Sequence, residues 1–299
     1  MRIVSWLTIS VLLACSGGSS STPPPDAGPA PLPVDEDLLA ARPYTVTVPP
    51  SYDPTKPAPL LLLLHGYGPG DDGDAVERYF GFEDPAKARG MLYVHPNGLM
   101  DSQQNRFWYA NDYCCDFEKK RPDDVAYLRT IIGDVARTYN LDRKRIYVVG
   151  LSAGGMMAHR FACDAADLVA AFVSLSGTLV KDATKCAPSE PVNAVEAHGD
   201  ADDTVKYAGG RQFGVDYASA HDTVAQWSVH DRCKGPIALA NDRYDIDTKL
   251  GGAETHVERY GSCDAAVELW TIEGGAHAPS LGDGWRTAVF EFLAAHPKK

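Results

Sequence analysis

This 299-residue sequence predicts a single domain built around a mostly parallel α/β sheet, with helices on both faces. Short apolar runs alternate along the chain with segments of helical periodicity, which is the pattern of parallel strands joined by crossover helices. Several of these runs are apolar at every position, as expected of strands that are covered on both faces. The composition, with 44% hydrophobic and 23% charged residues, is that of a globular protein.

The first residues predict an export signal followed by a tether. Met1 and Arg2 precede an apolar run that is too short to cross a membrane. Residues 12–15 resemble a bacterial lipobox, in which lipid is attached to Cys15, although a plain signal peptide that contains a cysteine would look the same. Residues 16–33 are rich in Gly, Ser, Thr and Pro and predict an extended linker.

We therefore expect three parts in the chain. These are a signal peptide at 1–14, a lipidated Cys15 with its linker at 15–41, and the folded catalytic domain at 42–299. Ser16 after the cysteine favours an outer-membrane destination, so we expect an exported protein that is either an outer-membrane lipoprotein or secreted. Its membrane contact would be the N-terminal lipid anchor alone. The net charge of −12 argues against nucleic acid as a partner.

Six cysteines remain once Cys15 is set aside. An even number in an exported protein predicts three disulfides. Neighbouring Cys114 and Cys115 are expected not to bond each other, because side chains at adjacent positions of extended backbone point apart. Zinc is the competing interpretation, but the cysteines contain no CxxC pair, and we expect no metal. The other four are Cys163, Cys186, Cys233 and Cys263.

The expected elements follow in chain order. Residues 44–48 alternate in polarity and predict a half-buried strand. Apolar runs predict buried strands at 60–64, 91–94 and 146–149, and further segments at 169–175, 192–197 and 267–272 are also strand-like. Helical periodicity predicts three helices, one that starts at Asp123 and Asp124, one over 213–227, and one over 285–293.

A nucleophile is predicted at the end of the strand 146–149. The sequence Gly150-Leu151-Ser152-Ala153-Gly154 is a G-x-S-x-G motif that lies between a strand and a helix, which is the context that the motif requires. Glycines on both sides let the backbone close around a strained serine, whose hydroxyl is then exposed at a helix N-terminus. A tight turn with a capping serine is the alternative interpretation.

A serine nucleophile needs a base and an acid that orients the base. Two later strands end in suitable loops, which lie where sites form in such sheets. The loop after 267–272 carries His277, the best base among the histidines. The loop after 192–197 offers three aspartates for the acid, and spacing alone does not choose among Asp200, Asp202 and Asp203.

The same chemistry needs two backbone N–H donors for the oxyanion. Ala153, which follows the nucleophile, supplies one. Tyr67, in the loop after strand 60–64, is the candidate for the other. Trp108 and Tyr109 are candidates for an aromatic substrate pocket, although core packing would equally explain them.

Five segments resemble a known group of exported α/β-hydrolase esterases. The group contains polyhydroxybutyrate depolymerases and the feruloyl and acetylxylan esterases of carbohydrate esterase family 1. The segments are LLLLHGYG, DDVAYLRTII, LDRKRIYVVGLSAGGMMAHRFAC, HGDADDTVKY and EGGAHAP, spread in the family's order over most of residues 44–296. The resemblance implies an α/β-hydrolase fold.

The resemblance also implies roles for single residues. The triad acid falls on Asp202, the base on His277 and the nucleophile on Ser152. The family often bridges the cysteines that match Cys233 and Cys263, which would leave Cys114 and Cys115 to pair with Cys163 and Cys186.

Two departures from the family pattern leave the substrate open. Many members have a tryptophan after the catalytic histidine, where this chain has Ala278-Pro279, and many have cysteine where Tyr67 stands.

These observations predict a secreted serine carboxylic-ester hydrolase that works through an acyl-enzyme. Its substrate would be a polyhydroxybutyrate-like polyester or a feruloyl or acetyl ester of plant polysaccharide, and it would need no cofactor. The alternatives are a serine peptidase of the same fold and a tethered binding protein without activity. The sequence leaves the oligomeric state open.

Overall fold

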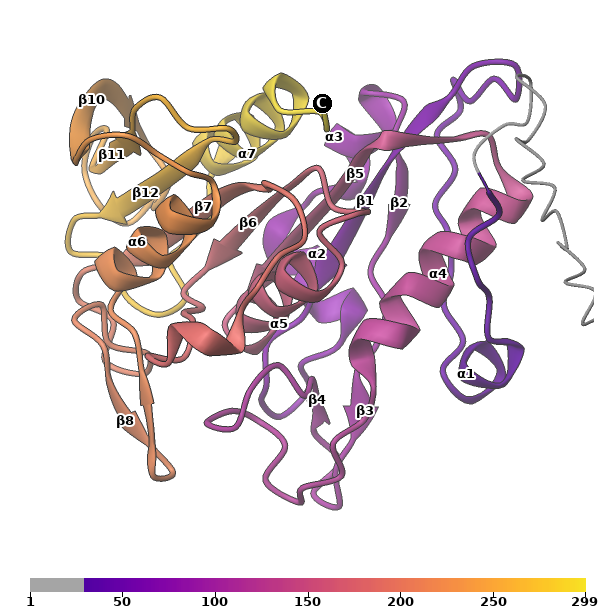
Figure 1. The fold of residues 1–299 in the computed structure, drawn as a ribbon, viewed down its shortest axis with the longest axis horizontal. Helices are drawn as coiled ribbons and strands as arrows, with labels where there is room; N and C mark the ends of the chain where they lie inside the picture. The colour runs from indigo at the N-terminus through magenta and orange to yellow at the C-terminus, as the bar shows by residue number, and fades with distance from the viewer. Residues whose placement is uncertain (1–29) are drawn as a thin grey trace, which may run out of the picture. The chain divides into compact units, whose positions relative to one another are not determined.

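The central sheet of this computed structural model, which describes residues 30–299, has eight strands in the order β10-β11-β12-β7-β6-β5-β1-β2 (Figure 1). Adjacent strands from β2 to β12 pair in parallel, and β11 and β10 complete the sheet in antiparallel pairs. The parallel strands are β1 (Ala58–Leu64), β2 (Leu92–Val94), β5 (Leu141–Leu151), β6 (Ala171–Leu175), β7 (Asn193–Gly199) and β12 (Val267–Ile272). The antiparallel edge consists of β10 (Ile237–Tyr244) and β11 (Thr255–Tyr260). The predicted parallel α/β sheet is confirmed.

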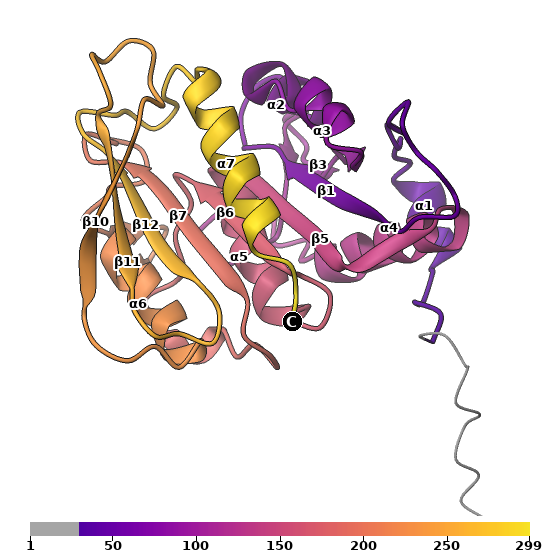
Figure 2. The same ribbon diagram turned by 90° about the horizontal axis from the view of Figure 1, so that it is seen from above.

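Helices cover both faces of the sheet (Figure 2). One face carries α2 (Gly73–Phe80), α3 (Glu83–Ala88) and α7 (Asp283–Ala295), and its buried residues form one hydrophobic cluster. The other carries α4 (Asp124–Thr138), α5 (Ala153–Asp164) and α6 (Ala220–His230), which pack in a second cluster. Parallel strands covered in this way are apolar on both sides, and every residue of β1 is accordingly buried.

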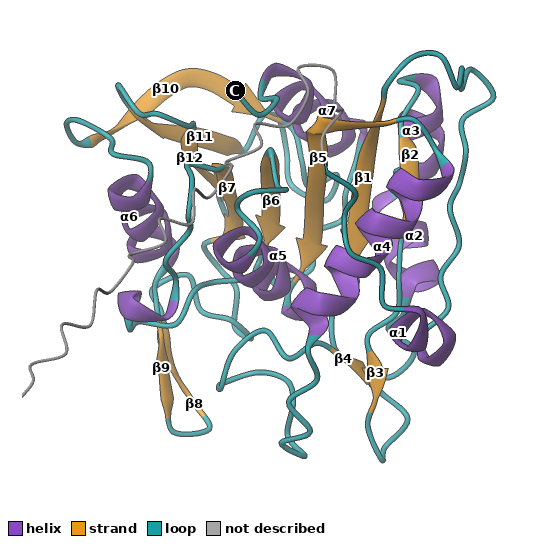
Figure 3. Cartoon of the chain, turned by 45° about the vertical axis from the view of Figure 1, so that its right-hand side comes forward, coloured by secondary structure: helices purple, strands orange, loops and turns teal. Residues whose placement is uncertain are grey.

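Two hairpins extend beyond the carboxyl ends of the parallel strands (Figure 3). One is formed by β3 (Leu99–Met100) and β4 (Arg106–Phe107), and the other by β8 (Gly210–Gln212) and β9 (Val215–Tyr217). A short 3-10 helix, η1, lies at Ala183–Lys185. The rings of Phe117, between β4 and α4, and Phe213, at the tip of β8–β9, contact each other at 4.8 Å between centroids. Loops from two distant parts of the chain thus meet at this end of the sheet.

Two predicted elements were wrong in extent. Residues 44–48 form only an isolated bridge between Thr47 and Tyr93, because Pro43 and Pro49 flank this stretch and lack the N–H that a longer ladder needs. The helix predicted over 213–227 begins at Ala220, where Ser219 accepts a hydrogen bond from the Asp222 N–H. Phe213 is 73% exposed in the hairpin, so its helical spacing to the later residues was a coincidence.

The N-terminal end of the described chain packs on the sheet domain. The compact unit that contains it spans Leu32–Lys299. Within it, α1 (Glu36–Ala41) packs on α4, and Arg42 forms a buried ion pair of 2.6 Å with Asp124. The predicted signal peptide and Cys15 lie outside the described residues. Among residues 30–299, no helix combines the length and the apolar content that a membrane span needs.

The disulfide pairing corrects one prediction. Bonds join Cys163 to Cys186 and Cys233 to Cys263, the second as the resemblance implies. Cys114 and Cys115 bond each other, so the expectation that they pair with Cys163 and Cys186 was wrong. The peptide between them is cis and their Cα atoms are 3.1 Å apart, so the argument from extended backbone does not apply to them.

Candidate active site

Ser152 lies in a sharp turn between β5 and α5. Its φ of 53° and ψ of −117° are outside the regions that residues with a side chain prefer. The turn closes because its neighbours are glycines: a Cβ at Gly150 would lie 2.2 Å from the Gly154 oxygen, and one at Gly154 would lie 2.2 Å from the Leu64 oxygen. The structure therefore places the predicted nucleophile on strained backbone at the start of a helix.

His277 and Asp202 come to Ser152 from the loops after β12 and β7. The Nε2 atom of His277 lies 2.9 Å from Ser152 Oγ, and its Nδ1 atom lies 2.8 Å from Asp202 Oδ2. The other two aspartates have different partners, since Asp200 accepts the Gly274 N–H at 2.6 Å and Asp203 is exposed. Of the three aspartates that the sequence left open, the structure brings Asp202 to the His277 imidazole.

Asp202 is held as a carboxylate. Its Oδ1 atom accepts the N–H groups of Thr204 and Val205 at 2.8 and 2.9 Å. Burial acts to raise the pKa of Asp202, but the hydrogen bonds with His198 and His277 outweigh it and hold this pKa well below its usual range. The side chain that would orient the base is therefore ionised throughout the neutral pH range.

The loop after β1 approaches the nucleophile. A Cβ at Gly66 would lie 3.8 Å from the Cβ of Ser152. Tyr67, the next residue, is therefore close to Ser152. Within residues 30–299, the Tyr67 N–H makes no backbone hydrogen bond. The Ala153 N–H lies in the first turn of α5, where such groups lack a partner within the helix. Two N–H groups are thus available beside the serine.

Asp71 is a further charged group at this loop. Its Oδ2 atom would be 3.2 Å from a Cβ at either Gly66 or Gly68. Burial raises the pKa of Asp71, Asp72 raises it further, and the interaction with His277 opposes both. This carboxyl was not among the predicted site residues.

His65 and Trp108 hold the loop after β1 in place through hydrogen bonds. The Nε2 atom of His65 accepts the Gly98 N–H at 2.9 Å, so its Nδ1 carries the proton that it donates to the Gly66 oxygen at 2.7 Å. Burial lowers the pKa of His65 to about 4, which keeps the ring neutral. The indole N–H of Trp108 donates to the His65 oxygen at 3.0 Å.

The two predicted pocket residues have different surroundings. Trp108 is fully buried, so it supports the loop from the core and presents no face to a ligand, contrary to the expectation. Tyr109 is partly exposed and lines two cavities of about 690 and 490 Å³. The larger cavity also reaches Met156 and Thr178, and Met156 lies one helical turn after Ser152.

Two polar residues that were not predicted lie behind Asp202. Glu196 and His198 project from β7 and are fully buried. The signal was present, because a glutamate within a buried strand is uncommon. Neither residue was among the predicted site residues.

Chemically, the arrangement is suited to acyl transfer. It combines a hydroxyl, an imidazole that contacts it, a carboxylate behind the imidazole and N–H groups beside the hydroxyl. The side chain of His277 is 20% exposed, so a substrate can reach it.

Comparisons with known proteins point to the same chemistry. The family model described as phospholipase/carboxylesterase matches residues 51–232. Feruloyl esterase C of Emericella nidulans is 30% identical over 266 residues, which cover 86% of this chain and 85% of that protein. Feruloyl esterase B of Piromyces equi is 28% identical over 257 residues, 82% of this chain, but the chain spans only 44% of that protein.

A solved structure supports the fold. The acetyl xylan esterase from Aspergillus awamori superposes with a TM-score of 0.58 at 12% identity, over 83% of this chain and 92% of that one. The resemblance to feruloyl and acetylxylan esterases that the sequence predicts is confirmed.

Proposed function

The chain belongs to the phospholipase/carboxylesterase family and is a carboxylic ester hydrolase, and from that premise we propose that Ser152, His277 and Asp202 are its catalytic triad. The observation that carries the proposal is the pair of contacts from His277, at 2.9 Å to Ser152 Oγ and 2.8 Å to Asp202 Oδ2. Both lie within the range required of a base that acts on a nucleophile and is oriented by an acid.

The reaction proceeds in two steps. His277 Nε2 accepts the Ser152 proton as Oγ attacks the ester carbonyl carbon, and the N–H groups of Tyr67 and Ala153 stabilise the oxyanion. His277 then gives the proton to the departing alcohol, which leaves the acyl group on Ser152. Water attacks this acyl-enzyme with the same base, releases the acid and restores the serine. Asp202 stabilises the imidazolium in both steps.

The substrate is a feruloyl or acetyl ester of plant polysaccharide. The names of the relatives support this choice, as does the cavity of about 690 Å³ beside α5, which is lined by Tyr109, Arg160 and Asp112 among others and could hold sugar units. A polyhydroxybutyrate-like polyester is the second candidate, because the sequence also resembles depolymerases of such polymers.

The protein works outside the cytoplasm, attached through a lipid on Cys15 or released. The three disulfides support export, because such bonds persist in oxidising compartments. Mass spectrometry of the mature N-terminus from the native membrane tests this part, with an acylated Cys15 expected and an unmodified first residue contradicting the anchor.

A substrate panel tests the proposed activity. We expect purified protein to hydrolyse p-nitrophenyl acetate together with methyl ferulate or acetylated xylan, with hydroxybutyrate oligomers as the test of the second candidate. Ser152→Ala should lose at least about 10³-fold in kcat. Hydrolysis that survives in Ser152→Ala would exclude the proposed mechanism.

A further inference from the structure

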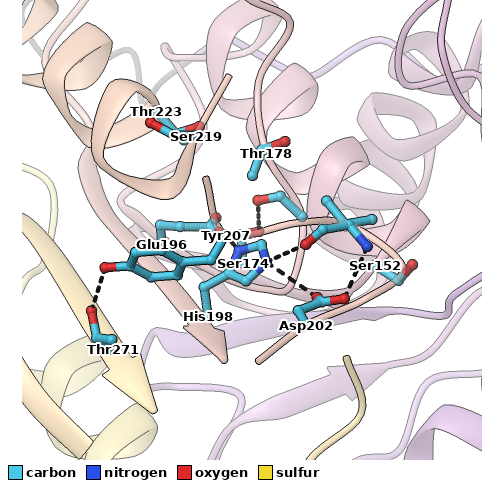
Figure 4. A network of polar contacts seen from close by, with 12 residues as sticks. Ser152, Ser174, Thr178, Glu196, His198, Asp202, Tyr207, Ser219, Thr223 and Thr271 are labelled. Carbon is cyan, nitrogen blue, oxygen red and sulfur yellow. Dashed lines mark hydrogen bonds and ion pairs between the residues drawn. The ribbon is translucent and has the colours of Figure 1, made fainter. Parts of the chain in front are cut away.

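A buried chain of hydrogen bonds extends from the triad into the core (Figure 4). Behind Asp202, His198 Nε2 lies 3.2 Å from Asp202 Oδ2, and His198 Nδ1 lies 2.8 Å from Glu196 Oε1. The other oxygen of Glu196 lies 2.9 Å from His159 Nε2, and His159 Nδ1 accepts the Trp227 indole N–H at 2.9 Å. At most 1% of each of the side chains of His159, Glu196 and His198 is exposed.

The partners fix where the protons lie. The indole nitrogen only donates, so His159 Nδ1 is an acceptor and the proton of this neutral ring is on Nε2, facing Glu196. The Val205 carbonyl only accepts and lies 2.7 Å from His198 Nε2, so that nitrogen carries a proton as well. One proton remains to be placed, in the 2.8 Å contact between His198 Nδ1 and Glu196 Oε1.

We propose that His198 is an imidazolium throughout the neutral pH range, held between Glu196 and Asp202, and that it is a positioning residue which sets the acidic limb of the activity profile. Placing the proton on His198 gives the ring a carboxylate on each side, with the Tyr207 ring packed against it at 5.7 Å between centroids. Burial opposes the charge, but the hydrogen bonds to Asp202 and Glu196 and the charge of Glu196 outweigh it and raise the pKa of His198 to about 9.

The consequence for the reaction rests on the proposed function. Asp202 Oδ2 faces two imidazoles, His277 at 2.8 Å and His198 at 3.2 Å. The cation on His198 offsets part of the negative charge that Asp202 presents to the active site. Among the described residues, the Asp71 carboxyl also interacts with His277, and its charge acts in the opposite direction. We therefore expect the acidic limb of the activity profile to lie at lower pH than it would without the buried pair.

The variant Glu196→Gln tests the effect of the His198 charge on the reaction while keeping the hydrogen bonds of the pair. The glutamine amide can donate to His198 Nδ1 and its oxygen can accept from His159, which leaves His198 neutral in the same place. The variant thus loses the positive charge of His198, which lies next to Asp202, and the negative charge of Glu196, which lies farther from it. We expect the acidic limb of the kcat/KM profile to move up by about one pH unit, with the plateau within about threefold of wild type. His159→Gln, which disturbs the same core without changing a charge, should leave the limb in place.

Nitrogen-15 NMR of histidine-labelled wild type tests the charge itself and does not depend on activity. We expect one histidine with both ring nitrogens protonated from pH 6 to 8, and we expect that signal to change to a neutral ring in Glu196→Gln. The proposal would be overturned if the His198 ring were neutral in wild type at pH 7. It would also be overturned if kcat/KM of Glu196→Gln fell at every pH while its acidic limb stayed in place. If no ester were hydrolysed at all, the proposed function would fail while the NMR result would still judge the charge of His198.

Discussion

At the scale of single residues, Ser152 carries the hydroxyl of the proposed nucleophile on a backbone conformation that is unfavourable for a residue with a side chain. A side chain at φ 53° and ψ −117° costs about 1–3 kcal/mol, which glycine avoids. Both Ser152→Ala and Ser152→Gly should be inactive, but we expect the glycine variant to be more stable than the alanine variant by about 1 kcal/mol, after its greater freedom in the unfolded chain is counted. Urea denaturation measures the difference, and an alanine variant of equal or higher stability would show that the turn is not strained.

Asp231, near the end of α6, allows the effect of a buried carboxyl on the pH dependence of stability to be tested. Its Oδ1 atom accepts the Val192 N–H at 3.0 Å, while Oδ2 is buried and has no hydrogen-bond partner in the described part of the chain. Burial raises the pKa of Asp231 to about 7, against the weaker opposing effects of the Val192 hydrogen bond and Arg232.

A carboxyl whose pKa is raised on folding stabilises the folded state below its unfolded pKa and loses this contribution as pH rises through its folded pKa. For Asp231 the loss falls between about pH 4 and 7. Asp231→Asn removes this dependence, so we expect its stability relative to wild type to increase by up to about 4 kcal/mol across that window and then stay level. Thermal denaturation from pH 4 to 9 measures it, and a difference that did not vary with pH would contradict the buried ionisation.

The residue scale also shows how far the sequence could predict the site. Ser152 was predictable because its motif is local, with glycines at fixed offsets in a strand–turn–helix context. The choice of Asp202 over Asp200 and Asp203 depends on which carboxylate the loop turns inward, and only a family resemblance indicated it. Glu196 was missed because no motif includes it.

At the scale of elements, the contact between the start of α5 and the end of β1 holds Ser152 beside the loop that carries Tyr67, the proposed oxyanion donor. A Cβ at Gly154 would lie 2.2 Å from the Leu64 oxygen and 2.6 Å from the His65 oxygen. Gly154→Ala should therefore push the two elements apart, lower the free energy of unfolding by about 1–3 kcal/mol and reduce kcat/KM by about 100-fold.

Gly251→Ala is the matched control for this substitution. A Cβ at Gly251 has no heavy atom within 4 Å, so this variant should keep both activity and stability. Full activity in Gly154→Ala would show that the close approach of α5 and β1 is not required.

Helices and strands were predictable where their burial requires a recognisable pattern of apolar residues. The strand β1 is apolar along its whole length, and all residues of β1 and β12 are buried, because both faces of these strands are covered. Most residues of β10 are instead partly or fully exposed at the sheet edge, so no such pattern marks that strand. The β3–β4 and β8–β9 hairpins have strands of two or three residues, too short for any periodicity.

At the scale of the whole molecule, disulfides join segments that are distant in the chain. The bond between Cys233 and Cys263 has a sequence separation of 30 residues and links the chain after α6 to the segment before β12. In the chain-entropy treatment, removing a crosslink of this span lowers the free energy of unfolding by about 3–4 kcal/mol.

We therefore expect a variant with Cys233→Ser and Cys263→Ser to unfold at lower urea concentration and to keep the kcat of wild type while folded. The Cys163→Ser and Cys186→Ser pair serves for comparison, since its sequence separation is 23 residues and its expected loss is similar. Unchanged urea midpoints in both variants would mean that these bonds do not stabilise the fold.

The whole molecule brings the triad together from three strand ends, β5, β7 and β12, and the central claim is that Ser152 carries the acyl group during turnover. The most direct measurement is mass spectrometry of the protein quenched in acid during hydrolysis of p-nitrophenyl acetate, followed by peptide mapping. We predict one acetyl group on the peptide that contains Ser152, none at that position in Ser152→Ala, and accumulation of the acetylated form in His277→Ala at raised pH. An acetyl group mapped to another residue in active protein, or steady turnover by Ser152→Ala, would contradict the account.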